Sequence, residues 1–93
     1  MKVVINRCFG GFGLSKKACE YLGIDWKVTH GYNYLSHSSR TAPELVQCVE
    51  TLGKAASGEF ADLKVVEIPD DVDWYIVEDA GLEMVVEAHR SWY

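Results

Sequence analysis

The sequence predicts a single α+β domain in which two helices pack on a sheet of about four strands. Segments rich in β-branched residues lie towards both ends of the chain, two helical patterns lie between them, and no linker or repeat divides the 93 residues. With 48% hydrophobic residues, the chain is apolar enough to fill one core and too short for two. We therefore treat residues 1–93 as one domain.

A glycine-rich segment joins the first strand to the first helix. Residues 2–8 are rich in β-branched side chains and end at a cluster of glycines, which is typical of a buried strand that runs into a turn. Ser15 can then cap a helix of about two turns, and Gly23 can close it. We expect a strand, a turn and a short helix in this order.

The middle of the chain has one irregular and one strongly helical part. Residues 24–41 show no clean period, so we expect no regular structure there. Thr41 and Glu44 have the spacing of a capping box around Pro43, and apolar residues then recur at three- and four-residue steps. These signals predict a second helix over residues 42–56.

The last third of the chain predicts strands. Residues 63–68 read as a central strand, and residues 72–78 and 82–88 read as a hairpin around a three-residue turn that contains Gly81. The apolar spacing of residues 82–90 also fits a helix. We prefer the hairpin, because apolar and acidic residues alternate and because Val and Trp favour strands.

Charge and cysteine content exclude several classes of protein. A net charge of −5 makes nucleic acid an unfavourable partner, and no run of about 18 apolar residues predicts a membrane span. Cys8, Cys19 and Cys48 are odd in number and unrelated in spacing, so we expect no disulfide framework, no metal site and no cofactor. Cys19 and Cys48 fall on apolar helix faces and should lie in the core. We expect the protein in the cytoplasm.

The glycine-rich segment is the main candidate for a ligand site. Gly10, Gly11 and Gly13 precede the helix cap Ser15, and a strand-to-helix turn of this kind can present backbone N–H groups to a phosphate or nucleotide. The spacing matches neither the dinucleotide fingerprint nor the P-loop. The alternative is purely structural, because a tight turn needs glycine for backbone reasons alone.

An anion at this loop would also need side-chain donors, and arginine offers a planar fork that suits phosphate. The further candidate ligand-binding residues are Arg7, Arg40, Tyr32, Tyr34, His89 and Arg90. Two copies of so small a domain enclose a pocket more easily than one, so we expect a homo-oligomer.

Two other classes of function stay open. The acidic surface and the tyrosines of residues 24–41 suit a module that binds another protein. Cys8, which precedes a helix, could act as an acidified nucleophile with His30, His37 or His89 as the base, which would make the protein an enzyme. We favour binding over catalysis.

Three segments carry a resemblance to a known family. They are VINRCFGGFGLS at 4–15, LKVVEIP at 63–69 and HRSW at 89–92. With these segments the chain resembles a family of small uncharacterised proteins encoded by bacteriophages and prophages. The resemblance implies no catalytic residues. It implies a phage protein in the bacterial cytoplasm that binds a host protein, as an inhibitor of a defence or housekeeping protein, or that sequesters a nucleotide signal used in defence.

Overall fold

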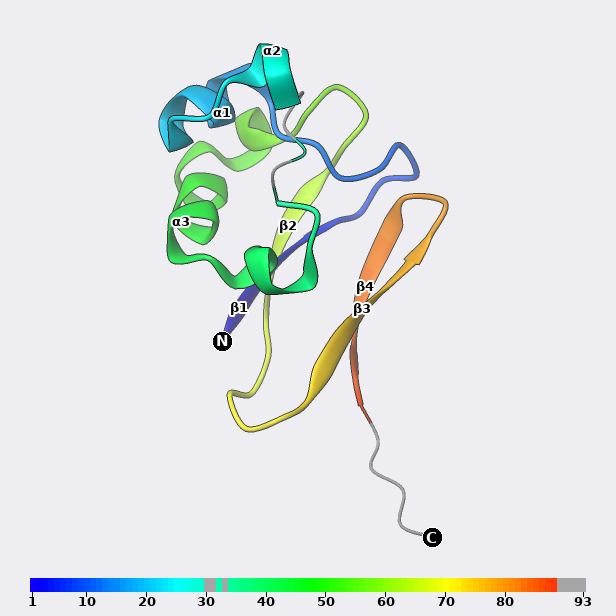
Figure 1. The fold of residues 1–93 in the computed structure, drawn as a ribbon. Helices are drawn as coiled ribbons and strands as arrows, with labels where there is room; N and C mark the ends of the chain where they lie inside the picture. The colour runs from blue at the N-terminus through cyan, green and yellow to red at the C-terminus, as the bar shows by residue number, and fades with distance from the viewer. Residues whose placement is uncertain (30–31, 33, 89–93) are drawn as a thin grey trace, which may run out of the picture.

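The computed structural model, which describes residues 1–29, 32 and 34–88, places helices on one side of a two-stranded sheet and a β-hairpin on the other (Figure 1). The elements are β1 (Lys2–Asn6), α1 (Lys16–Leu22), α2 (Trp26–Thr29), η1 (His37–Thr41), α3 (Pro43–Leu52), η2 (Gly53–Ala56), β2 (Leu63–Glu67), β3 (Trp74–Asp79) and β4 (Leu82–Glu87). This confirms the α+β class. Within these residues, no helix is long and apolar enough to cross a membrane.

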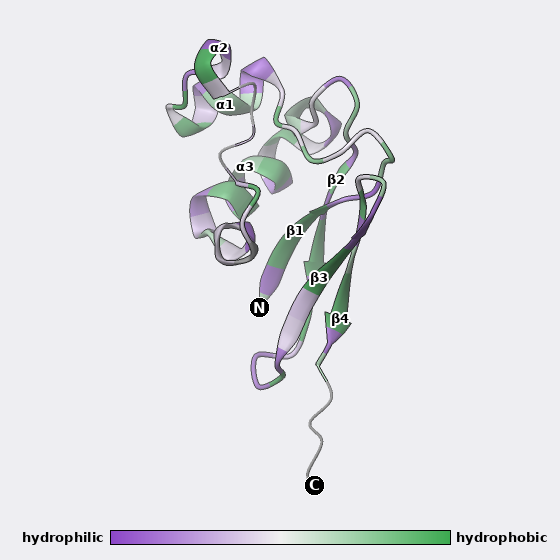
Figure 2. Ribbon diagram, turned by 45° about the vertical axis from the view of Figure 1, so that its right-hand side comes forward, coloured by the Kyte–Doolittle hydropathy of each residue, from purple (hydrophilic) through white to green (hydrophobic). Residues whose placement is uncertain are grey.

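The main core lies between the helices and one face of β1 and β2. These strands pair antiparallel with Val4 opposite Val65, so alternate side chains of both strands face the helices. Figure 2 shows the hydrophobic stretches of β1 and β2. The buried residues of this core are Val4, Phe12, Leu14, Ala18, Cys19, Leu45, Val46, Cys48, Val49, Ala56 and Leu63. The prediction that Cys19 and Cys48 are core residues is confirmed.

The hairpin covers the other face of the β1–β2 sheet. Val3 and Ile5 alternate with Val4 and are 0% and 3% exposed. Ile5 and Val66 line one small cavity together with Val85 of β4, which shows that the hairpin packs over this face. The sheet is therefore apolar on both faces, and β1 reads as a continuous hydrophobic run.

Helix α1 begins and ends at the predicted residues. The Ser15 hydroxyl accepts a hydrogen bond from the Ala18 N–H (3.0 Å) and donates one to the Ala55 carbonyl (2.5 Å). Gly23 takes the left-handed conformation with φ 73°, and its N–H bonds back to the last turn. Both end signals are local, which is why the sequence alone placed this helix correctly.

The segment between α1 and α3 is more regular than predicted. Residues 24–41 contain α2, which begins where the Asp25 carboxylate accepts a hydrogen bond from the Lys27 N–H, and the 3-10 helix η1. The predicted capping box is wrong, because η1 runs to Thr41 and the Thr41 hydroxyl donates to the Ser38 carbonyl (3.1 Å). Ala42 is the N-cap of α3 and provides no side-chain hydrogen bond.

Two other predicted boundaries move. Strand β1 ends at Asn6, two residues earlier than predicted, because the Asn6 side chain turns back to bond the Cys8 backbone at both its N–H and its carbonyl. The predicted helix over residues 42–56 is α3 followed by η2. The change occurs at Gly53, whose φ of 57° ends the α-helix.

The C-terminal hairpin is confirmed against the helical alternative, but its turn is shorter than predicted. Asp79 pairs with Leu82, so the turn has two residues, Ala80 and Gly81, and not three. Both have positive φ, 51° and 93°, which is the pattern of a type I′ turn. The twist of this turn matches the twist of the strands that it joins.

The predicted four-stranded sheet is divided into two sheets of two strands. The edge of β1 that faces away from β2 bonds side chains instead of a neighbouring backbone. There the Asn6 N–H donates to Glu83 Oε1 (2.8 Å), and the Val4 carbonyl accepts from Arg40 Nη1 (3.3 Å). The Arg40–Glu83 ion pair thus takes the hydrogen-bonding positions on β1 that β4 would occupy in a continuous sheet.

Arg40 and Glu83 form a buried and well-bonded pair. They are 2% and 5% exposed, and Arg40 reaches the two Glu83 oxygens with both terminal nitrogens at 2.5 and 2.8 Å. Arg40 also donates to the carbonyls of Tyr34 and Leu35, and its guanidinium lies 3.9 Å from the ring centre of Phe12. Such a pair is tolerable inside a protein only because its polar atoms are satisfied in this way.

Candidate functional site

The glycine-rich loop between β1 and α1 packs directly against the backbone of another loop, residues 57–61. A Cβ added to Gly10 would lie 2.1 Å from the Phe60 carbonyl oxygen, and one added to Gly58 would lie 3.1 Å from the Gly13 carbonyl. The Gly58 N–H donates to the Gly13 carbonyl (2.8 Å) and joins the two loops, and beside it the Ser15 N–H donates to the carbonyl of Ala56 at the end of η2 (2.9 Å). These contacts support the structural interpretation of Gly10.

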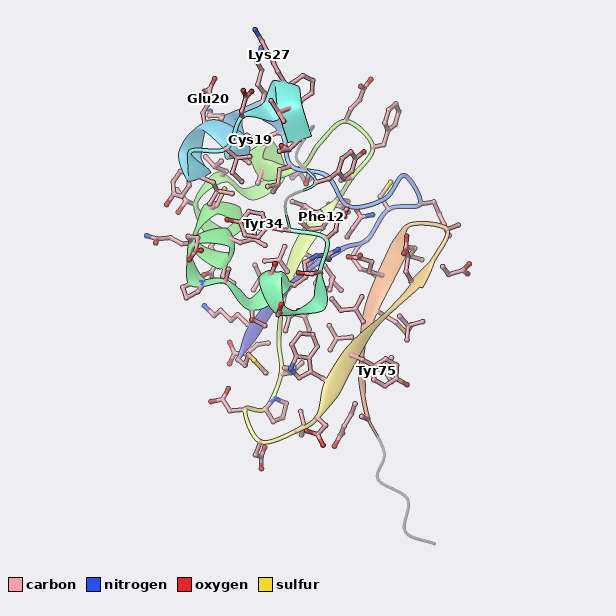
Figure 3. The ribbon with its side chains drawn as sticks, viewed as in Figure 1. Phe12, Cys19, Glu20, Lys27, Tyr34 and Tyr75 are labelled. Atoms are coloured by element: carbon pink, nitrogen blue, oxygen red, sulfur yellow. The ribbon has the colours of Figure 1, made fainter. Side chains whose placement is uncertain are left out.

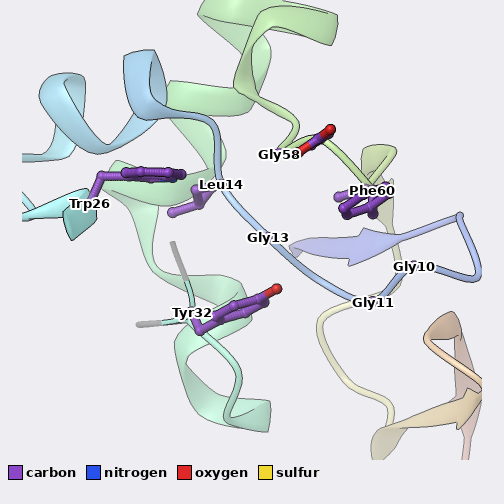
Figure 4. Close-up of a pocket in the computed structure, with 10 residues that line it drawn as sticks. Gly10, Gly11, Gly13, Leu14, Trp26, Tyr32, Gly58 and Phe60 are labelled. Carbon is purple, nitrogen blue, oxygen red and sulfur yellow. The ribbon is translucent and has the colours of Figure 1, made fainter. Parts of the chain in front are cut away.

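A cleft of about 300 Å³ opens beside this junction. Its lining comes from the glycine-rich loop, from α2 and the segment after it, and from the loop of residues 57–61 (Figure 4). The described lining residues are Gly10, Gly11, Gly13, Leu14, Trp26, Tyr32, Gly58, Glu59, Phe60 and Ala61. This cleft includes all three predicted glycines and is the best candidate site in the described part of the chain.

Three aromatic rings surround the glycine backbone in this cleft. Trp26 and Tyr32 lie on one side of Gly13, and Phe60 lies on the other (Figure 4). Trp26 is half-buried, whereas Tyr32 and Phe60 are 48% and 67% exposed. A Cβ added to Gly13 would lie 3.6 Å from the Tyr32 ring, so Gly13 faces that ring. Aromatic rings that line one cleft can offer stacking contacts to a flat group.

The charge of the cleft is negative where it can be described. Glu59 is the one charged side chain among the described lining residues. Lys16 Nζ lies 6.0 Å from the ring centre of Trp26, and Lys16 lines a neighbouring groove that shares Trp26. Lysine is thus near one wall of the cleft, but no described lysine or arginine lines it.

The structure keeps two of the predicted arginines, Arg7 and Arg40, out of the cleft. Arg40 is buried on the edge of β1 with its donors bonded to Glu83 and to backbone carbonyls, which leaves it unable to reach a ligand. Arg7 is exposed, but its Nη1 donates to the Glu83 carbonyl (2.7 Å), and it lines hollows on the hairpin side. Neither arginine lines the cleft.

The other predicted residues divide between cleft and core. Tyr32 lines the cleft, whereas Tyr34 packs against the core, where burial raises the pKa of its hydroxyl. Phe12 and Tyr34 point into the space between the helices and β1, while Tyr75 of the hairpin points away from the body (Figure 3). Ser15 is used as the α1 cap and does not line the cleft.

Several of the predicted site residues lie outside the described part of the chain. His30, His89 and Arg90 lie outside the described residues, as does the side chain of His37. Cys8 is half-buried, and its N–H donates to Asn6 Oδ1. The Cys8 enzyme hypothesis therefore stays a prediction. Among the residues whose side chains are described, no three His, Cys, Asp or Glu side chains lie together as a metal site.

Sequence reasoning missed half of the cleft. Trp26 and the loop of residues 57–61 line it, and neither was a candidate. The second loop did carry a signal, because Gly58-Glu59-Phe60 places a glycine two residues before an aromatic residue, as Gly10-Gly11-Phe12 does.

Comparison of the chain with protein-family models, with curated proteins and with solved structures found no match. The resemblance to a bacteriophage family stays a prediction. The function is argued below from the residues of the cleft.

Proposed function

We propose that this chain is a non-enzymatic binding protein whose glycine and aromatic cleft takes a small molecule with a flat ring. The observation that carries the proposal is the placement of Trp26, Tyr32 and Phe60 around the bare backbone of Gly13. Tyr32 and Phe60 are exposed and their rings can stack on a ring of the ligand, and half-buried Trp26 forms a third wall. A nucleobase is one ring of suitable shape.

The phosphate part of a nucleotide has less support. Arg7, Arg40 and Arg90 were expected to hold it; Arg90 lies outside the described residues, and Arg7 and Arg40 bond Glu83 and do not line the cleft. Helix α1 has seven residues, and its cap Ser15 already serves one of its first N–H groups. The ring therefore contributes more to recognition in this proposal than any phosphate.

The proposal is tested by removing one wall of the cleft. Phe60→Ala removes a ring but keeps the Cβ that packs on Gly10, so the fold should persist. Phe9→Ala is the matched control, because Phe9 is 66% exposed against 67% for Phe60 and does not line the cleft. Binding of a flat-ring fragment set, followed by protein NMR, should weaken about fivefold to tenfold in Phe60→Ala and remain unchanged in Phe9→Ala.

The natural ligand is sought in parallel by mass spectrometry. Protein purified from bacterial cytoplasm is denatured, the released small molecules are identified, and the intact assembly is weighed by native mass spectrometry. A stoichiometric ring compound that is lost in Phe60→Ala supports the proposal, and the same measurement gives the oligomeric state. Equal fragment binding by Phe60→Ala and the wild type would remove the cleft as the site.

A second candidate function is binding to a host protein through the hairpin. Its outer face presents Tyr75, Val77 and Met84, which are 44%, 39% and 51% exposed, and Tyr75 points away from the rest of the chain (Figure 3). Exposed apolar residues on one face are typical of protein interfaces. Tyr75→Ser with Met84→Ser should abolish capture of a host protein, whereas Phe60→Ala should not affect it. Unchanged capture by the hairpin variant would exclude this surface.

A bacteriophage origin and the cytoplasm of a bacterial host belong to this proposal as its setting. They are supported by the resemblance of residues 4–15, 63–69 and 89–92 to phage proteins. In that setting, the ligand of the cleft would be a host metabolite or signal that the protein sequesters.

A further inference from the structure

We infer that the ligand of the cleft carries a positive charge on or beside its ring, so that its class is a small organic cation. This inference rests on the proposed function and adds the sign of the ligand's charge. It replaces the anionic ligand that the glycine-rich loop suggested in the sequence.

The aromatic walls suit a cation. The faces of Trp, Tyr and Phe rings carry negative electrostatic potential, which attracts a cation within about 6 Å of the ring centre. The fold already uses this interaction twice, with the Arg40 guanidinium over Phe12 at 3.9 Å and the Lys16 ammonium over Trp26 at 6.0 Å. The cleft brings three such rings, Trp26, Tyr32 and Phe60, around one space.

The charges on and around the cleft also favour a positively charged ligand. Glu59 is the one charged group among the described lining residues, and the whole chain has a net charge of −5. A carboxylate at the rim of a cleft with low-dielectric walls attracts cations and repels anions. Planar cations also fit between rings more easily than a hydrated phosphate, because a delocalised charge is weakly hydrated.

Lys16 is the group that could favour the opposite sign. Its ammonium lies 6.0 Å from the ring centre of Trp26, and it lines the neighbouring groove together with Glu20, Asp25 and Lys27. The two lysines and two carboxylates of that groove balance in formal charge, so Glu59 is left as the charged group on the cleft itself. If Lys16 held an anionic ligand, its replacement by methionine would weaken binding, whereas a cationic ligand should bind Lys16→Met as well as the wild type or better.

The experiment uses three probes that differ in charge and hardly in shape: benzamidine, benzamide and benzoate. Each is titrated into the full chain, and the dissociation constant is taken from NMR shifts of the Trp26 indole and the Tyr32 and Phe60 rings. We expect benzamidine to bind about fivefold tighter than benzamide, and benzoate to bind most weakly. Glu59→Gln should reduce the preference for benzamidine, and Glu78→Gln, which removes an equal charge from the hairpin, should keep it.

The outcomes separate this inference from the proposed function. Equal affinities for the three probes at the cleft, or a preference for benzoate that Lys16→Met abolishes, would overturn the cation and leave the ring site in place. Absence of any shift at Trp26, Tyr32 and Phe60 with all three probes, at millimolar concentration, would overturn both. A benzamidine preference that persists in Glu59→Gln and in high salt would support the cation and assign its recognition to the aromatic rings and not to Glu59.

Discussion

The edge of β1 and the cleft use their residues in opposite ways. At the edge of β1, the charged side chains of Arg40 and Glu83 are buried and bonded to each other and to the backbone. In the cleft, the lining consists chiefly of uncharged residues, glycines and aromatic rings, and it is open to solvent. The comparison shows that a charged residue type indicates a ligand site only where its hydrogen-bond donors or acceptors are not already used within the protein.

The strongest way to break this comparison is to remove one partner of the buried pair. Arg40→Met leaves the Glu83 carboxylate buried without its cation, and we expect a loss of about 3–5 kcal/mol in the free energy of unfolding. The measurement is urea denaturation followed by circular dichroism. Adding Glu83→Gln to Arg40→Met should recover part of the loss, because the amide is neutral and its oxygen can still accept from the Asn6 N–H.

The exposed pair Lys2–Glu50 is the matched control for that experiment. Its atoms are 2.8 Å apart and its side chains are 45% and 46% exposed, so water screens the charges. Lys2→Met should therefore cost much less stability than Arg40→Met. Equal losses for the two variants would contradict the structural role of Arg40.

The next largest effect is expected for the glycine that packs the two loops together. Gly10→Ala places a Cβ 2.1 Å from a backbone oxygen that cannot move independently, and we expect a loss of about 1–3 kcal/mol. Thermal denaturation measures it. If Gly10→Ala is as stable as the wild type and loses only ligand binding, the loop serves the ligand and not the packing.

The dependence of stability on alkaline pH tests the burial of the two helix cysteines, Cys19 and Cys48. Burial raises the pKa of the Cys19 and Cys48 thiols above the ordinary value of 9.0, so the unfolded chain releases these protons at a lower pH than the native chain. Their contribution to stability is complete below about pH 9 and is lost as pH rises through the native pKa values.

Denaturation curves at a series of pH values measure this loss. In Cys19→Ala with Cys48→Ala the fall above pH 9 should be shallower, although the core loses packing. Identical slopes in the wild type and in the double variant would contradict the assignment to the buried thiols.

The smallest effect on stability is expected for a substitution in the cleft, Gly13→Ala. Gly13→Ala adds a Cβ that meets its nearest neighbour, the Tyr32 ring, at 3.6 Å, which is an ordinary contact. We expect a change in unfolding free energy within about 0.5 kcal/mol. The added methyl group enters the space between the rings, so flat-ring fragments should bind several-fold more weakly in an NMR titration. A marked loss of stability would show that Gly13, like Gly10, is needed for packing and would contradict this prediction.

Local signals explain what could be predicted from the sequence. Ser15 and Gly23 cap α1 by contacts within a few residues, and the alternation in residues 82–87 is a property of that strand alone. The division of the sheet depends on Arg40 and Glu83, which are 43 residues apart. No local pattern distinguishes a buried arginine from a solvated one, so both the split sheet and the loss of Arg40 as a ligand residue were out of reach.

The candidate site was half predictable for a related reason. Gly10, Gly11 and Gly13 could be found because they stand together in the sequence, and Tyr32 could be found because its surroundings are polar. Trp26 and Phe60 join the cleft only when α2 and the loop after η2 fold over the glycines. The proposed ligand differs from the one expected from the sequence, because aromatic rings line the cleft and neither Arg7 nor Arg40 does.

The two loops that line the cleft are also tied to each other before any ligand arrives. The Leu14–Ser57 bridge and the hydrogen bonds on either side of it hold the backbones of Gly13 and Gly58 at a set separation. A ligand that enters the cleft beside this junction need not wait for these segments to assemble. Association should then be a single kinetic phase whose observed rate rises linearly with ligand concentration, and its tightness should be decided by how slowly the ring leaves.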